Sequence, residues 1–339
     1  MLDTIFSPLG LIILVLAIVV ISAFARRNRR PTEEFSPVHK GKAHVGGCKF
    51  DRRLAALPLK APKIDTTNLP APDARVKQAL ANVSEAVVRD RLNQLSGEVD
   101  TRVRGKVVKI ASRNSHHKDI DVAMTWLEEF YASIGMTAVR VPYQVRGKTY
   151  FNLVAELPGK VNPEKIVIVS GHLDATVGSP WSSESVAPGA DDDGSGTIAV
   201  TEVARALKDL PLAYTVRFVH FTGEEQGLWG SYKYSDKCAA EKADILGVFQ
   251  MDMVGYCALP GNRVDIHDTE DKNGSHELVV ALVRAVAQYG LSLNAVDTHN
   301  HAVDDRSDHA GFLDHGWKAV LISEEFSDQG FNPNYHRRS

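Results

Sequence analysis

Three aspartates stand side by side between glycines in the segment APGADDDGSG, residues 187–196. Adjacent carboxylates repel one another, so the run fits either a solvated turn or a site where a cation gathers acidic ligands. Further side chains that bind metals or carry protons directly follow the apolar runs of VIVSGHLDA, VHFTGEEQG and FQMDM, namely His172, Asp174, Glu224, Glu225 and Asp252.

These polar side chains are expected to converge in space. In an open α/β sheet the ligand crevice lies beyond the carboxyl ends of the strands. Convergence of three such loops with the aspartate run disfavours a solvated turn and predicts a metal site. Histidine and carboxylates without cysteine suit a catalytic zinc or a related divalent ion. The surplus of carboxylates indicates two ions that share a bridging ligand.

The elements that must position this site are alternating strands and helices. Apolar residues recur at helical spacing over 119–135, 195–210 and 276–290. The short β-rich runs that alternate with them are YFNLVAEL, KIVIVSG, YTVRFVHFTG, ILGVFQMDM and KAVLIS. Several of these runs are apolar throughout, as in strands covered on both faces. The pattern predicts an α/β fold over residues 81–339, a single-domain three-layer sandwich whose mainly parallel central sheet is wrapped by helices.

A different kind of segment precedes this domain. Residues 8–25 form an uninterrupted apolar run about long enough to cross a bilayer, and RRNRR follows at 26–30. We expect residues 1–30 to form one N-terminal transmembrane helix, either a membrane anchor or an uncleaved signal with a basic flank. The positive-inside rule would place the domain behind RRNRR in the cytoplasm. Residues 31–80 are rich in proline and charge, which predicts a linker or an extended arm.

Bulk composition narrows the functional classes. The 339 residues carry a formal net charge of −3 and no basic stripe beyond the short cluster near the start, so no nucleic-acid partner is expected. The three cysteines are Cys48, Cys238 and Cys257, and none lies in a CxxC pair. They do not form a disulfide framework and do not fix the redox compartment.

Five motifs together resemble those of a known family. GHLDA, APGADDDGSG about 20 residues further on, GEEQGLWGS, MDM and FNPNYH occur in this order. They are similar to the five metal-site motifs of the co-catalytic di-zinc aminopeptidases of clan MH. That family includes the bacterial leucyl aminopeptidases and, more distantly, glutamate carboxypeptidases and glutaminyl cyclases. The resemblance runs from about residue 84 to YHRRS, whereas the family pattern usually continues past the last histidine.

The resemblance implies a metal ligand set for two zinc ions per chain. His172 would bind one ion and Asp192 would bridge both. Glu225 would bind one of the two ions. Asp252 would complete the site of one ion and His336 the site of the other.

The resemblance also implies roles for residues beside these ligands. Glu224 would be the general base, and the carboxylate of Asp174 would fix the ring of His172. Asp191 and Asp193 would flank the bridging Asp192, with a strained peptide after it that aims its carboxylate.

The activity implied by the resemblance is that of a metallo-exopeptidase. Two zinc ions would acidify a water, Glu224 would take its proton, and the hydroxide would attack the first peptide bond of a substrate with a free N-terminus. A glutaminyl-cyclase-like acyltransferase with a single zinc and a non-catalytic receptor-like relative are the alternatives, and the full set of ligand positions together with Glu224 argues against both. Because relatives of this type are commonly exported, the domain is expected outside the cytoplasm, against the indication of RRNRR.

Five further histidines are not among the expected metal ligands. His309, in RSDHAGF, matches a family motif near the substrate pocket without being a ligand. His299 and His301 lie in a polar loop and are expected to face water. His116 and His117 are expected to be surface residues.

Overall fold

The computed structural model describes residues 63–338 except for 258–261, 269–271, 299–302 and 327–329. The expected transmembrane segment, its basic flank and residues 31–62 therefore lie outside the described residues, as do His299 and His301. Among the helices that the structure describes, none has both the length and the apolar character needed to span a membrane.

A central eight-stranded sheet organises the fold, in the order β3-β4-β6-β5-β7-β10-β8-β9. The inner strands β6, β5, β7 and β10 are mutually parallel. The strands are β3 Ala138–Val145, β4 Lys148–Leu157, β5 Asn162–His172, β6 Tyr214–Phe221, β7 Asp244–Met251, β8 Arg263–His267, β9 Asn294–Thr298 and β10 Ala319–Ser323. A separate hairpin joins β1 (Thr101–Val103) and β2 (Lys106–Val108).

The sheet is mixed. Its central strands are parallel, but antiparallel pairs on both sides of them correct the expectation of a mainly parallel sheet there. β4 pairs antiparallel with both β3 and β6, and β10 pairs antiparallel with β8. The chain turns from β3 into β4 through Arg146 and Gly147, whose φ values are 49° and 75°. A two-residue loop with both φ values positive forms a hairpin and forces antiparallel pairing. Among the described residues β3 ends the sheet, and it carries Pro142 in its middle.

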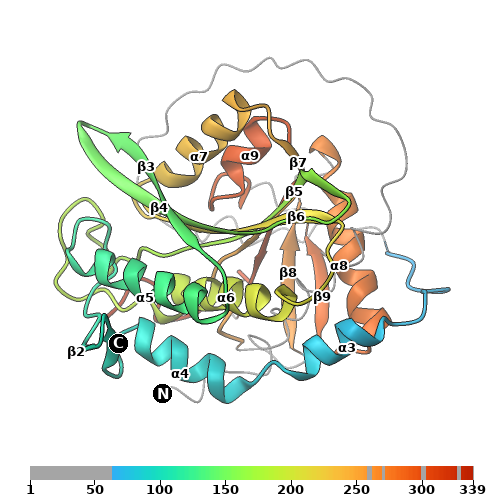
Figure 1. The fold of residues 1–339 in the computed structure, drawn as a ribbon, viewed down its shortest axis with the longest axis horizontal. Coiled ribbons are helices and arrows are strands. Elements are labelled where there is room, and N and C mark those ends of the chain that lie inside the picture. The colour runs from blue at the N-terminus through green and yellow to red at the C-terminus, as the bar shows by residue number, and fades with distance from the viewer. Residues whose placement is uncertain (1–62, 258–261, 269–271, 299–302, 327–329, 339) are drawn as a thin grey trace.

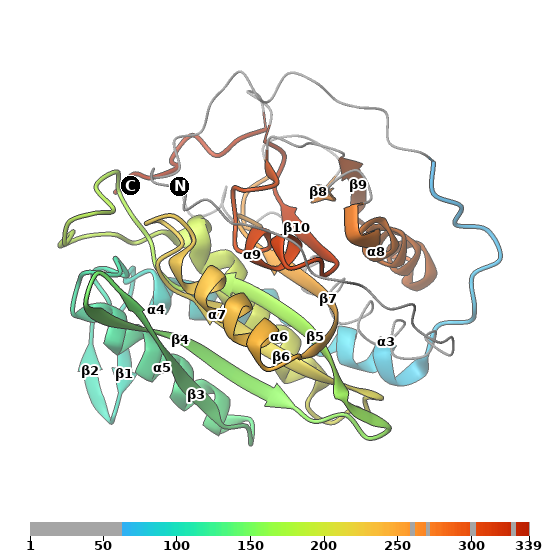
Figure 2. The ribbon, with the colours of Figure 1, turned by 90° about the horizontal axis from the view of Figure 1, so that it is seen from above.

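Helices cover both faces of the sheet (Figure 1). Five lie on one face, with α4 packed outside α6: α3 Ala74–Ala81, α4 Glu85–Leu95, α5 Asp119–Ser133, α6 Gly196–Leu207 and α8 His276–Tyr289. Two further helices lie together on the other face (Figure 2): α7 Trp229–Ala240 and α9 Ala310–Asp314. This arrangement gives a single α/β domain whose sheet lies between two helical layers.

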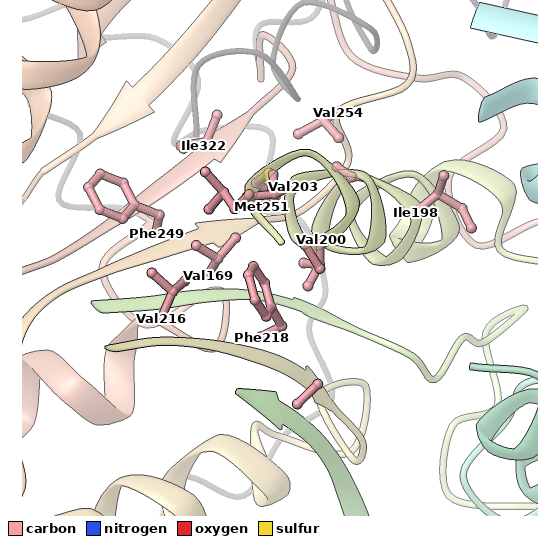
Figure 3. Packing of buried hydrophobic residues seen from close by; sticks show 14 of the residues in the cluster. Val169, Ile198, Val200, Val203, Val216, Phe218, Phe249, Met251, Val254 and Ile322 are labelled. Atoms are coloured by element: carbon pink, nitrogen blue, oxygen red, sulfur yellow. The ribbon is translucent and has the colours of Figure 1, made fainter. Parts of the chain in front are cut away.

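The central strands bury side chains on both faces. In β5, Val167 and Val169 join the larger core under α6, whereas Ile166 and Ile168 join the smaller core under α7 and α9. This explains the continuously apolar strand sequences, because neither face is left to solvent. Figure 3 shows the larger core, where side chains of the strands lie against Val200 of α6.

The predicted helices are found with small shifts at their ends. The run over 119–135 is α5, and the run over 276–290 is α8, which ends at Gly290 in the left-handed conformation. The run over 195–210 begins one residue later, because residues 190–195 form an irregular turn before α6. The linker or extended arm expected over residues 31–80 is described from residue 63 onward, and from residue 74 it forms helix α3.

Candidate metal centre

The loops that carry the candidate residues meet at one edge of the sheet. His172 is the last residue of β5 and pairs with Phe221, the last residue of the parallel strand β6. Asp252 directly follows β7, which runs parallel to β5 on its other side. Because parallel neighbours end at the same edge, the segments after β5, β6 and β7 converge as the sequence predicted.

Two groups of ligand atoms share one residue. Nε2 of His172 lies 3.1 Å from Asp192 Oδ1 and 3.5 Å from Asp252 Oδ1. Nε2 of His336 lies 3.0 Å from Asp192 Oδ2 and 3.1 Å from Glu225 Oε2. Within each group the ligand atoms all lie within 4.8 Å of one another. Asp192 thus presents one oxygen to each group, which is the arrangement of a carboxylate that bridges two cations.

The donor atoms fit a pair of metal ions better than a set of hydrogen bonds. Nε2 of His172 and Nε2 of His336 are buried and make no hydrogen bond among the described residues, and neither does Oε1 of Glu225. A buried polar atom without a partner costs free energy unless something else binds it. Imidazole nitrogens and carboxylate oxygens are the ligands that zinc takes in catalytic sites.

The pKa shifts in the group of Asp192, Glu225 and His336 also indicate a site that would bind positive charge. Burial opposes a proton on His336, but the carboxylates of Glu225 and Asp192 outweigh it and raise the pKa of His336 to about 11. Burial, and next the charge of Asp192, raises the pKa of Glu225 to about 7. Such shifts mark a buried site with more carboxylates than cations, which a bound dication would neutralise.

The three adjacent aspartates point to three different partners. Asp193 is fully buried and accepts hydrogen bonds from the backbone N–H groups of His172 and Gly196, at 2.9 and 2.8 Å. Asp191 accepts from the Gly255 N–H at 2.8 Å and from Asn332 Nδ2 at 2.6 Å. The peptide bond between Asp192 and Asp193 is cis. Only the middle carboxylate therefore faces the ligand groups, while its neighbours bind the surrounding loops.

The structure changes the role expected of Asp174. Nδ1 of His172 is 3.0 Å from the backbone carbonyl of Asp174 but 3.7 Å from its carboxylate, so the carbonyl is what orients the ring. The Asp174 carboxylate instead accepts from Ser115 Oγ at 2.9 Å and from the Glu224 N–H at 3.3 Å. It therefore holds the turn that carries Glu224.

Glu224 and Glu225 face different parts of the site. Glu225 is beside His336, whereas the negative charge of Glu224 is felt at His172. Burial opposes protonation of His172, but Asp252 and next Glu224 outweigh it and raise its pKa well above the usual range. The backbone of Glu224 is fixed in a turn, because its carbonyl accepts from the N–H groups of residues 227 and 228 at 2.8 and 2.9 Å.

Some residues that build the site were not identified from the sequence. Ser307 Oγ donates to Asp252 Oδ2 at 2.6 Å, and its motif RSDHAGF was noted only for His309. Arg113 is fully buried and donates to the carbonyls of Leu173 and Gly189 at 2.8 and 2.7 Å. No sequence pattern distinguished Arg113, because its partners are backbone carbonyls brought near by the fold.

The remaining histidines are placed as follows. His309 is buried outside both ligand groups, and burial lowers its pKa to about 4. His116 and His117 are half-buried rather than exposed. Nδ1 of His116 lies 3.1 Å from the Tyr150 hydroxyl. The His116 ring packs edge-on against Trp229, which follows the turn that carries Glu224 and Glu225. The expectation of two surface residues is therefore wrong for His116, whose ring belongs to an aromatic cluster.

A further cluster of one histidine and two aspartates occurs at the edge formed by β8 and β9. Nδ1 of His276 lies 3.0 Å from Asp268 Oδ2 and 3.5 Å from Asp297 Oδ2. These contacts are those of an imidazole paired with two carboxylates, and they are separate from the site beyond β5, β6 and β7.

Fold and site together define an α/β domain with two groups of possible metal ligands beyond the ends of its parallel strands. Residues 152–339 match Peptidase family M28. The chain belongs to this family, which agrees with the resemblance seen in the five motifs.

Curated relatives and solved structures agree with this assignment. A probable zinc metalloprotease of Pyricularia oryzae is 30% identical over 223 residues, which are 62% of this chain and 43% of that protein. Leucine aminopeptidase 1 of Metarhizium robertsii is 26% identical over 81% of this chain and 72% of that protein. The LapA aminopeptidase of Legionella pneumophila has a TM-score of 0.62 at 19% identity, over 84% of this chain and 72% of that one. This last likeness establishes the fold.

Proposed function

We propose that this chain is a zinc-dependent aminopeptidase that binds two zinc ions. The observation that carries the proposal is Asp192, whose two oxygens lie 3.1 and 3.0 Å from histidines of different ligand groups. His172 and Asp252 would hold one ion, Glu225 and His336 the other, and Asp192 both. When bound, the zinc ions would polarise a peptide carbonyl and acidify a water.

Glu224 is the general base of the proposed reaction. It takes a proton from the attacking water and returns it to the leaving amine, which is the work of a carboxylate placed beside but outside the ligand groups. Asp174 acts through the backbone, because it accepts the Glu224 N–H and the hydroxyl of Ser115. Ser115 in turn accepts the Gly223 N–H at 3.0 Å, so the turn is held at two successive amides.

The substrates proposed are peptides with a free N-terminus. A free α-amino group in its neutral form would bind near the second zinc, and this would place the first peptide bond at the metal centre. The enzyme would then remove residues from the N-terminus.

A glutaminyl-cyclase-like acyltransferase is the second candidate. A glutaminyl cyclase of Porphyromonas gingivalis has a TM-score of 0.53 at 17% identity over 75% of this chain and 89% of that one, so the fold alone does not separate the two. The presence of both ligand groups favours two zinc ions over one.

The test is metal content combined with turnover. The purified chain is dialysed against zinc, its zinc per chain is measured, and it is offered an aminoacyl-anilide and a peptide with N-terminal glutamine. Two zinc ions and anilide hydrolysis support the aminopeptidase. One zinc with cyclisation of the glutamine supports the acyltransferase. A chain without metal and without turnover would be a non-catalytic relative.

We also propose, from the sequence alone, that residues 8–25 anchor the chain in a membrane with the peptidase domain on the extracytoplasmic side. Protease added to intact cells would then digest the domain. Digestion only after lysis would place the domain in the cytoplasm, as RRNRR indicates.

A further inference from the structure

We propose that Asn332 is a positioning residue that holds His336 at the metal centre, and that it sets the affinity of one of the two zinc sites. The proposal rests on the proposed two-zinc function. It concerns the Asp192–Glu225–His336 group and leaves the other group unchanged.

His336 differs from the other ligands in how the fold holds it. His172 ends β5 and Asp252 directly follows β7, so both are carried by central strands. His336 lies in a segment of turns after β10, with a positive φ of 53° and a side chain that is 17% exposed. A ligand on such a segment needs other contacts to fix its position.

Asn332 supplies those contacts four residues earlier. It is only 5% exposed, and its side-chain Nδ2 donates to Asp191 Oδ2 at 2.6 Å. Its backbone N–H donates to Glu324 Oε1 at 2.8 Å. Its Oδ1 accepts the Asn334 N–H at 2.9 Å, and its carbonyl accepts the Tyr335 N–H at 3.2 Å.

These bonds connect the His336 segment to the bridging ligand. Asp191 is the residue before Asp192, and the Gly255 N–H fixes its other oxygen. The bonds from Asn332 to residues 334 and 335 then shape the turn that presents His336. Asn332 therefore sets the distance between His336 and Asp192 Oδ2, two ligands of the same ion.

Removing the amide should weaken one zinc site selectively. Loss of a partner that orients a metal ligand typically lowers metal affinity about 10–100-fold. We expect Asn332→Ala to lower the affinity of one zinc by this factor. The second zinc, on the strand-borne ligands, should keep its wild-type affinity.

The experiment titrates metal-free wild type and variants with zinc against a competing chelator, and it measures the melting temperature of each metal-free protein. Asn334→Ala is the matched control, because Asn334 is exposed and contributes its backbone N–H to the turn. Asn332→Asp keeps the acceptor for that N–H but removes the donor to Asp191, and it serves if the alanine variant fails to fold.

The expected result is one weakened and one unchanged zinc site in Asn332→Ala and Asn332→Asp, with activity restored by excess zinc. Their metal-free melting temperatures should fall below that of Asn334→Ala, because Asp191 Oδ2 loses its buried donor, but the affinity of the other zinc site should not change. If both Asn332 variants bind two zinc ions with wild-type affinity, this inference is wrong, whereas the proposed function is unaffected. Equal weakening of both sites with a lower metal-free melting temperature would show a general structural role and overturn it too. A wild type that binds fewer than two zinc ions would overturn the proposed function itself.

Discussion

Replacing Glu224 by glutamine tests whether this residue is the general base rather than a metal ligand. Backbone hydrogen bonds hold Glu224 in its turn: its N–H donates to Asp174, and its carbonyl accepts from residues 227 and 228. Glutamine keeps the size of the side chain and leaves these backbone bonds in place. The variant should therefore fold and keep the two proposed zinc ions, because neither ligand group contains Glu224.

The effect on turnover follows from the loss of the proton acceptor. General-base catalysis contributes about 10²–10⁴-fold to rate. Because each tenfold change in rate corresponds to 1.36 kcal/mol in the barrier, kcat should fall by an amount equal to about 3–5 kcal/mol. KM should change little, since Glu224 is outside both ligand groups.

The assay is steady-state hydrolysis of an aminoacyl-anilide alongside zinc content, with Glu225→Gln as the matched variant. Glu225→Gln should lose zinc affinity and regain part of its activity in excess zinc, because Glu225 Oε2 belongs to a ligand group. If Glu224→Gln loses zinc while Glu225→Gln keeps it and is inactive, the two roles are reversed. Full activity in both variants would refute hydrolysis by this site.

Three further outcomes are expected. Asp192→Asn should lower both zinc affinities, whereas Asp191→Asn should spare the zinc site of His172 and Asp252. Equal metal loss in the two variants would show that Asp192 is not the bridging aspartate. Burial lowers the pKa of His220 to about 3, so the stability it adds is present above its unfolded pKa of about 6.5 and is lost as pH falls below that. Urea unfolding of metal-free His220→Gln should show a weaker loss between pH 6.5 and 4. Phe218→Ala, at a fully buried position, should cost about 3–5 kcal/mol by the same method, and a cost below 1 kcal/mol would contradict the core described.

The sequence was sufficient to predict which residues meet at the site, but not how each side chain is oriented there. The convergence of His172, Glu225 and Asp252 could be predicted, because strands with continuously apolar runs lie side by side in a parallel arrangement and end at one edge. The two groups of possible metal ligands consist of the five residues named from the motifs, and their roles as zinc ligands stay a prediction.

What could not be predicted depends on contacts between distant segments. The resemblance named Asp192 as the bridge, but nothing in the sequence showed what the carboxylates of Asp191 and Asp193 bind. Their donors at Gly255 and His172 lie beside them only in the folded chain. The carboxylate of Asp174 was assigned to the ring of His172, but a nearer backbone carbonyl satisfies that ring. The antiparallel flank was missed because alternation of strands and helices says nothing about the hairpin at Arg146.

The proline in the outermost strand β3 has a consequence for self-association. An open strand edge is a template onto which another molecule can add a strand, and this is a common route to aggregation. Pro142 has no N–H to offer such a strand, and it interrupts the row of donors in the middle of β3. Within the described part of the chain, this flank of the sheet is therefore poorly suited to edge-to-edge growth.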